Sequence, residues 1–193
     1  MKISHGFSES ERAQIAALYW EAFGAKLGRV LGPRPHALRF LAAALDPAHA
    51  LCARAPDGTL LGVAGFKTAR GALVLGGRRE MRAAYGILGA AWRGGLLALL
   101  DSDVDNRRFL IDGIFVAPET RGRGVGSRLI EALAQEARSG GYREIRLEVI
   151  DENLRARALY ERRGFRAVGR RPLGVLRVVF GFRAATTMVR RLG

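Results

Sequence analysis

The residues from Arg121 to Ser127 have the types and the spacing of a site that binds a phosphate group. The segment reads Arg-Gly-Arg-Gly-Val-Gly-Ser and follows a β-rich run that ends at Val116. Glycines permit positive φ angles and close approach of the backbone, and the first amides of a helix have no partner inside it. The helix dipole and the charges of Arg121 and Arg123 add attraction for an anion. The sequence therefore predicts an anion cradle at the start of a helix.

Two familiar nucleotide-binding patterns do not fit this segment. No Gly-Lys-Ser/Thr follows the glycines, as a Walker loop requires. A dinucleotide fingerprint has Gly-x-Gly-x-x-Gly directly after the strand, whereas here four residues intervene and the third glycine comes one position early. These departures disfavour a nucleotide-dependent oxidoreductase or a kinase. Taken alone, the segment leaves an ordinary turn and helix cap open as the alternative.

Composition limits the class of protein that carries this loop. The chain has 193 residues, of which 49% are hydrophobic, so we expect one globular domain over residues 1–193. Its one cysteine, Cys52, excludes a disulfide framework and a paired-thiolate zinc site, and is expected to be a small core residue. The three histidines lie far apart in the sequence, which disfavours a metal enzyme.

The chain is strongly basic, with 32 Lys and Arg against 18 Asp and Glu and a net charge of +14. Lysine occurs only at Lys2, Lys26 and Lys67, so the rest is arginine, whose planar fork suits phosphate or carboxylate. An anionic ligand or partner is one interpretation, and a solvated surface encoded by a GC-rich genome is the other.

The N-terminal segment lacks the apolar run of a signal peptide, which predicts a cytoplasmic protein. The apolar stretch 83–100 contains Arg93 and two adjacent glycines, so we expect a buried or surface-docking helix there and no transmembrane segment. This stretch could build a wall of a substrate pocket or pack a homodimer. Four aromatic residues are further candidates for that pocket, although aromatics at helical spacing are more often core: Tyr19, Trp20, Tyr85 and Trp92.

Periodicity and turn signals place the loop in an α/β protein. Ser8 and Glu11 form a possible capping box before the first helix. Helices are expected at 8–28, 37–45, 78–100, 127–138 and 153–163, and strands at 51–55, 60–66, 109–116, 145–150 and, once or twice, within 175–189.

A second motif follows the loop and gives it a family resemblance. The run FLIDGIFVAPE and Arg-x-x-Gly-x-Gly at Arg121, Gly124 and Gly126 resemble the acetyl-CoA-binding motif of the GNAT family of N-acetyltransferases. IRLEVIDEN and RARALYERRGF then match that family's next strand, its asparagine and its Tyr-x-x-x-Gly-Phe block. The resemblance covers roughly 105–170, the expected cofactor-binding core, while 67–104 matches no motif of the family. It implies a mixed, mostly antiparallel sheet flanked by helices, with splayed central strands forming the acetyl-CoA cleft.

The resemblance also implies roles for single residues. Asp112 matches a strand position proposed as the base or water holder, and Tyr160 matches the general acid for the departing thiolate. Asn153 matches a residue beside the cofactor, although it could be an N-cap or serve both purposes. Asp112 could equally be a structural strand residue. The other residues expected to bind the cofactor are Phe115, Val116, Arg121, Gly122, Arg123, Gly124, Val125, Gly126 and Ser127, with Tyr160 among them.

The resemblance therefore implies an acetyl-CoA-dependent N-acetyltransferase that acts without a metal on an amine of a small molecule or protein. Two alternatives stay open: a basic nucleic-acid- or ribosome-associated protein, and a non-catalytic CoA-binding regulatory domain. The first lacks interleaved aromatics for base stacking and is not favoured. The arginines at 155, 157, 162 and 163 could reach the phosphates of CoA or form a solvated face.

Overall fold

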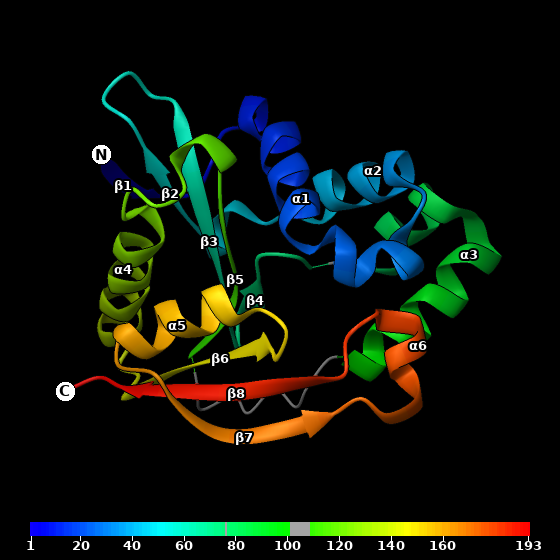
Figure 1. Cartoon of the computed structure of the whole chain (residues 1–193). Helices are drawn as coiled ribbons and strands as arrows, with labels where there is room; N and C mark the ends of the chain where they lie inside the picture. The colour runs from blue at the N-terminus through cyan, green and yellow to red at the C-terminus, as the bar shows by residue number, and fades with distance from the viewer. Residues whose placement is uncertain (76, 101–108) are drawn as a thin grey trace.

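The computed structural model describes residues 1–75, 77–100 and 109–193, which form an α/β protein (Figure 1). The strands are β1 (Lys2–His5), β2 (Ala50–Arg54), β3 (Leu60–Thr68), β4 (Gly71–Ala72), β5 (Phe109–Val116), β6 (Glu144–Ile150), β7 (Arg166–Pro172) and β8 (Ala184–Arg191). The helices are α1 (Arg12–Leu31), α2 (Arg34–Ala44), α3 (Arg78–Leu100), α4 (Val125–Ser139), α5 (Leu154–Arg162) and α6 (Arg177–Phe180). The first residues of the expected core, 105–108, lie outside the described part.

The strands form one sheet in the order β1-β2-β3-β5-β6-β8-β7, with β4 beside β3. Every pairing between these strands is antiparallel except that of β5 with β6. This mixed, mostly antiparallel sheet confirms the predicted fold class. The hairpin of β2 and β3 and the strands β5 and β6 lie within one or two residues of their predicted positions.

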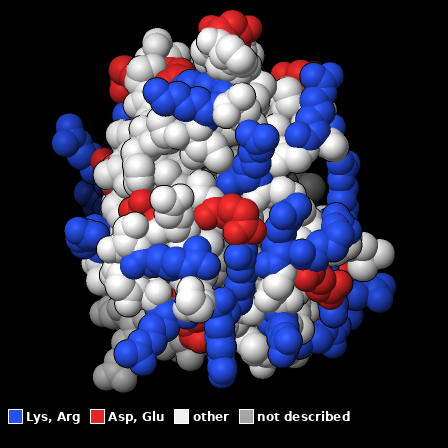
Figure 2. All heavy atoms as spheres, turned by 90° about the vertical axis from the view of Figure 1, so that its left-hand side faces the viewer, with Lys and Arg blue, Asp and Glu red and all other residues white. Residues whose placement is uncertain are grey.

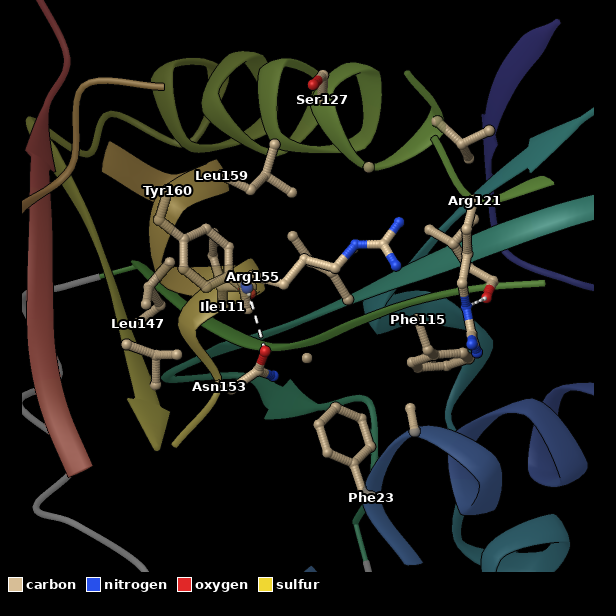
Figure 3. Close-up of a pocket in the computed structure, with 18 of the residues that line it drawn as sticks. Phe23, Ile111, Phe115, Arg121, Ser127, Leu147, Asn153, Arg155, Leu159 and Tyr160 are labelled. Carbon is tan, nitrogen blue, oxygen red and sulfur yellow. Dashed lines mark hydrogen bonds between the residues drawn. The ribbon is translucent and has the colours of Figure 1, made fainter. Parts of the chain in front are cut away.

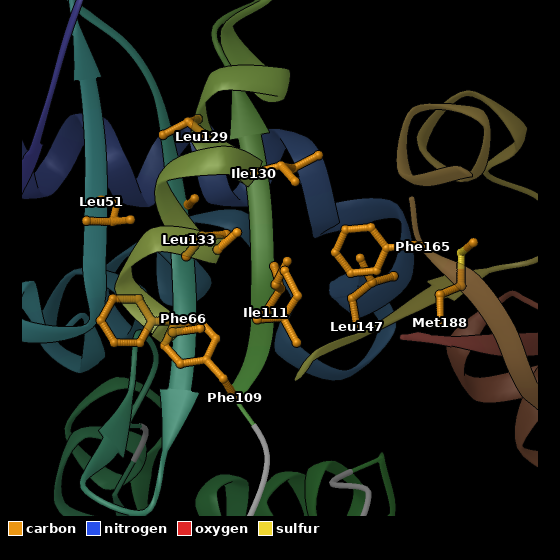
Figure 4. Packing of buried hydrophobic residues seen from close by; sticks show 14 of the residues in the cluster. Leu51, Phe66, Phe109, Ile111, Leu129, Ile130, Leu133, Leu147, Phe165 and Met188 are labelled. Atoms are coloured by element: carbon orange, nitrogen blue, oxygen red, sulfur yellow. The ribbon is translucent and has the colours of Figure 1, made fainter. Parts of the chain in front are cut away.

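Helix α4 covers one face of the sheet and α1 and α2 cover the other (Figures 1 and 4). The apolar residues of α4 recur at helical spacing, so Leu129, Ile130 and Leu133 share one face and are completely buried. They pack with Leu51 and Phe66 of the sheet. The strands alternate between the two layers, and Cys52 is accordingly buried in the layer under α1 and α2.

A bulge at Asp112 shapes the middle of the sheet. Phe66 of β3 pairs with Ile111, and the residue before it, Gly65, pairs with Gly113, so Asp112 is the extra residue on β5. A bulge bends its strand and re-aims side chains, and it is common beside active sites. Beyond it Phe115 packs in the layer opposite to that of Ile111.

The same region of β5 separates from β6. The parallel pairing consists of Phe109 with Ile145 and Leu110 with Arg146, and it ends before the bulge. From that point β5 and β6 diverge, which confirms the predicted splay of the central strands. The opening between them lies next to the start of α4, so the predicted loop is placed at its mouth.

The sequence prediction was wrong for the two strands at the edges of the sheet. β1 and β7 were not predicted, and both are largely exposed. An edge strand needs no buried face and carries charges that discourage pairing with other chains, so it gives no alternating apolar signal. The expected strand from Val175 is also wrong over 174–180, where Gly174 and Gly181, with φ of 55° and 75°, bracket two short helical segments.

Helix α3 forms where the sequence predicted a helix, with a kink at Gly86, whose φ of 71° is not helical. Ile87 and Leu88, just after the kink, are 71% and 86% exposed, so these side chains of α3 lie at the surface. Within the described residues, no helix has both the length and the apolarity needed to cross a membrane.

Candidate active site

A cavity of about 620 Å³ occupies the opening between β5 and β6 (Figure 3). Its walls come from α1, β5, the loop before α4, the first turn of α4, β6 and α5. Binding sites for small molecules and cofactors typically have volumes of roughly 300–1,000 Å³. The cavity is therefore large enough for an elongated ligand that enters at the loop and follows β5.

The structure brings the predicted site residues together around this one cavity. Of the predicted set, only Arg123 does not line it, and its side chain is exposed. The predicted residues that line the cavity are Asp112, Phe115, Val116, Arg121, Gly122, Gly124, Val125, Gly126, Ser127, Asn153 and Tyr160. Their roles toward a ligand stay predictions, but their common location is a fact of the fold.

The cradle, defined as residues Arg121–Ser127, has the backbone that an anion site requires. Gly122 and Gly124 have φ angles of 83° and 81°, a region that other residues rarely adopt. A Cβ atom at either position would meet no atom within 4 Å, so the space over the loop is open. Gly124 is the N-cap of α4, and the first amides of the helix are directed toward that space.

Two side chains, those of Thr120 and Arg121, hold the cradle in place through hydrogen bonds. The buried hydroxyl of Thr120 donates to the carbonyl oxygens of Leu61 and Ala117, both at 3.0 Å. The Arg121 guanidinium bonds to the Glu21 carboxylate at 2.9 Å and to the Val116 carbonyl at 3.2 Å. Arg121 is therefore positioned across the mouth of the cavity, between β5 and α1 (Figure 3).

Helix α5 supplies Asn153 and Tyr160 from the opposite wall. The Asn153 side chain accepts a hydrogen bond from the Ala156 amide at 3.1 Å, which confirms its reading as an N-cap, and it also lines the cavity. Tyr160 packs near Phe165, with ring centroids 5.8 Å apart. Burial raises the pKa of Tyr160 to about 12, so its hydroxyl keeps its proton at neutral pH.

Charged side chains gather at the end of the cavity away from the cradle. Asp112 comes from the bulge in β5, Glu148 from β6 and Lys26 from α1, and all three line the cavity. Burial is the main cause that lowers the pKa of Lys26, and the negative charges of Glu148 and Asp112 act in the opposite direction. Burial raises the pKa of Tyr19, and the negative charge of Asp112 raises it further.

Helix α1 contributes cavity residues that the sequence analysis did not name. Phe23 was expected on the core face of the first helix, but its ring reaches the cavity and lies against β5. A Cβ on Gly113 would come within 2.7 Å of that ring, so glycine at this position lets α1 approach the strand. No local signal identifies Lys26 or Glu148 as site residues, because each is one charge on an amphipathic element.

The aromatic residues proposed for the acceptor pocket do not line this cavity, nor does any residue of α3 whose side chain the structure describes. Tyr19 lies one layer behind it, with its ring centroid 5.6 Å from that of Phe115. Tyr85 donates its hydroxyl proton to the Leu31 carbonyl, and Trp92 is 47% exposed. Packing between helices, and not ligand contact, explains the helical spacing of Tyr19 and Tyr85.

The arginines of α5 divide between the cavity and the surface. Arg155 and Arg162 line the cavity, whereas Arg157 pairs with Glu161 at 3.0 Å. Figure 2 shows Lys and Arg side chains spread over the face that carries α4 and α5, with acidic side chains between them. Among the described residues, no group of three or more His, Cys, Asp and Glu could hold a metal ion.

A split mixed sheet with a glycine-rich cradle at its opening is the fold of acetyltransferases, as comparisons with solved structures show. A structure described as an acetyltransferase matches with a TM-score of 0.66 at 18% identity, covering 100% of both chains. A protein from Bacillus anthracis str. Ames, solved in complex with acetyl coenzyme A, matches with a TM-score of 0.52 at 21% identity, over 75% of this chain and 62% of that one. At these identities the likeness shows the fold.

The model of the acetyltransferase (GNAT) family matches residues 12–165, so the chain belongs to this family. This confirms the resemblance drawn from the two motifs. Thialysine N-epsilon-acetyltransferase of Bos taurus is 41% identical over 58 residues, which are 30% of this chain and 34% of that protein. The counterpart from Sus scrofa is 38% identical over 72 residues, 37% and 42% of the two chains. The matched segment is thus well under half of these relatives.

Proposed function

We propose that this protein transfers an acetyl group from acetyl-CoA directly to an amine, with residues 1–193 working as one domain. The observation that carries the proposal is the single cavity that joins the cradle to Tyr160 and Asp112. An anion site, a channel beside the edge of β5 that β6 leaves open and two groups able to move protons lie in the order that this reaction needs. The family match supports the same conclusion.

The cradle end suits the phosphates of CoA. The backbone amides at the start of α4 offer donors in open space. The Arg121 guanidinium, held by Glu21 and the Val116 carbonyl, adds positive charge at the mouth of the cavity. Beyond the cradle, Phe115 and Val116 belong to the part of β5 that has separated from β6. Their backbone groups on that side are available to the amides of a pantetheine arm, as in the pairing of an added strand.

The other end suits the chemical step. An alkylamine has a pKa near 10.4 and is mostly protonated at neutral pH, so it must lose a proton before it attacks the thioester. Asp112 is exposed to the cavity and takes that proton directly or through water. The departing CoA thiolate then receives a proton or a hydrogen bond from the Tyr160 hydroxyl, which burial keeps protonated.

The acceptor is an amine of a small molecule or a protein. The carboxylates of Asp112 and Glu148 at the acceptor end favour an amine that arrives as a cation. The names of the bovine and porcine relatives make thialysine and lysine the first probes. A cytoplasmic location stays a prediction, a homodimer stays one interpretation of the apolar stretch, and nucleic acid stays a partner that is not favoured.

Calorimetric titration with acetyl-CoA tests the proposal, using wild type and Gly124→Glu. The substitution forces a side chain into a left-handed position and places a negative charge in the cradle, so we expect micromolar binding to wild type and a loss of at least about 100-fold. Gly58→Glu is the matched control, because Gly58 has a φ of 88° and open space but lies in the β2–β3 turn. A folded wild type that binds no acetyl-CoA overturns the proposal.

A screen for release of CoA with thialysine, lysine and short lysine-containing peptides then assigns the acceptor class. Turnover with free amino acids alone indicates a small-molecule enzyme, and turnover with peptides alone indicates a protein acceptor. Tight binding of acetyl-CoA without turnover on any amine favours the regulatory alternative. Binding of nucleic acid that weakens steeply with salt, without binding of acetyl-CoA, favours the other.

A further inference from the structure

Lys26 presents an amine inside the cavity of the proposed reaction. It lies on α1 one turn after Ala22, and both residues line the cavity together with Asp112 and Glu148. The chain contains only two other lysines, Lys2 and Lys67, and neither lines this cavity. A single primary amine of the protein therefore shares a pocket with the groups proposed to activate an acceptor.

The surroundings of Lys26 resemble those expected for the amine of an acceptor. Its Nζ lies 5.2 Å from the centroid of the Phe182 ring, and two carboxylates that interact with it electrostatically, Glu148 and Asp112, line the same cavity. Burial lowers the pKa of Lys26, an effect that Glu148 and Asp112 oppose and Arg171 reinforces. The neutral, nucleophilic form of this amine is therefore more accessible than that of a lysine in water.

The path from the cradle ends near this amine. Asp112 lies four residues before Val116, which is about 13 Å along an extended strand at ~3.3 Å per residue. An arm that leaves the cradle and follows β5 runs toward Asp112, and the charge of Asp112 acts on Lys26. A lysine side chain is flexible, with several rotatable bonds, and can sweep the space between them.

We propose that Lys26 is a self-acetylation site, modified by acetyl-CoA bound in the protein's own cavity. The neutral Nζ attacks the thioester carbonyl, the new N–C bond forms as the C–S bond breaks, and CoA leaves as the thiol with the proton that the amine gives up. The products are Nε-acetyl-Lys26 and free CoA, and no oxidant or further reactant is needed. The inference rests on the proposed binding of acetyl-CoA and adds a modification site to it.

Mass spectrometry of the full chain incubated with acetyl-CoA, without an added amine, tests the site. We expect the gain of one acetyl group, with Lys26 modified at least about tenfold faster than Lys2 because the bound thioester is held beside it. Trypsin does not cleave after an acetylated lysine, so the modification appears as the peptide 13–29 in place of 13–26. Lys2 and Lys67 report solution acylation in the same sample.

Three variants separate the routes to the modified lysine. Gly124→Glu should lose the modification with the cradle, and Gly58→Glu should keep it. Mixing Lys26→Arg with Gly124→Glu should leave the Gly124→Glu chain unmodified, because the reaction is within one chain. Modification of that chain in the mixture, or equal modification of all three lysines, overturns the proposal. Acetyl-CoA binding without modified Lys26 overturns this inference alone, whereas the absence of binding overturns the proposed function with it.

Discussion

At one end of the cavity the lining groups belong to one short segment, Arg121–Ser127 without Arg123, whereas at the other they are charged side chains from separate elements. The cradle acts through its backbone, so its geometry depends on glycines and on the start of α4. The acceptor end acts through Lys26, Asp112 and Glu148, which the packing of α1 and the bulge in β5 bring together. The cradle is therefore sensitive to substitution of its glycines, and the acceptor end to substitution of its charged side chains.

The largest effect should come from Asp112→Asn, which keeps the shape of the side chain and removes the proposed base. We expect kcat to fall by about 10³-fold, because general acid–base catalysis typically contributes ~10²–10⁴-fold. The affinity for acetyl-CoA, measured by calorimetry, should stay within about twofold. Equal losses in binding and in turnover would instead make Asp112 a structural residue of the bulge.

Tyr160→Phe tests the point where the two ends meet. We expect kcat to fall by about 10²-fold with little change in the affinity for acetyl-CoA, since the hydroxyl acts on the leaving thiolate. The wild-type rate should also show no loss from ionisation of this residue up to mildly alkaline pH, because the pKa of Tyr160 is raised to about 12. A variant that turns over at the wild-type rate would point to a purely packing role against Phe165.

Arg121→Gln tests the side-chain contribution to the cradle. We expect the affinity for acetyl-CoA to weaken about fivefold, because Arg121 is exposed and its charge is screened, and the loss should shrink as salt is added. Arg123→Gln is the matched control in the same loop, since Arg123 does not line the cavity. An equal loss in both variants would mean that the charge of the loop matters and the position of Arg121 does not.

The smallest effect should come from Glu11→Gln, which loosens the start of α1. The Arg54 guanidinium donates to the two Glu11 oxygens at 2.8 and 2.9 Å, and these bonds are the main reason that the pKa of Glu11 falls from 4.5 to about 2. A lowered pKa in the folded state stabilises the protein above about pH 4.5, and this contribution is lost as the pH falls toward 2.

Thermal melts at a series of pH values check this linkage. The melting temperature of Glu11→Gln should lie below that of wild type at pH 7, and the difference should narrow between pH 4.5 and 2. Glu9→Gln is the control, because the Glu9 side chain is 81% exposed. Calorimetry should show an unchanged affinity for acetyl-CoA, since neither Glu11 nor Arg54 lines the cavity. A difference that persists at pH 2 would assign the effect to packing.

Much of the fold could be predicted from local patterns. The central elements β5, α4, β6 and α5 lie within about two residues of their predicted bounds. The elements β5, α4 and β6 have buried residues that leave an apolar period, whereas α5 has no buried residue. The edge strands β1 and β7 were missed, because an exposed strand has no such period. The segment after Gly174 was misjudged, since residues that alternate in sequence there form helical turns.

The cradle and the family were determined by the sequence itself. A positive φ at Gly122 and Gly124 and a helix that begins directly after them are local properties, set within one short segment. The acceptor end was decided only by the tertiary structure. Lys26 lies far from Asp112 and Glu148 in the sequence. The close approach of Phe23 to Gly113 places α1 beside them. Contacts between distant segments depend on packing, which no single stretch of sequence encodes.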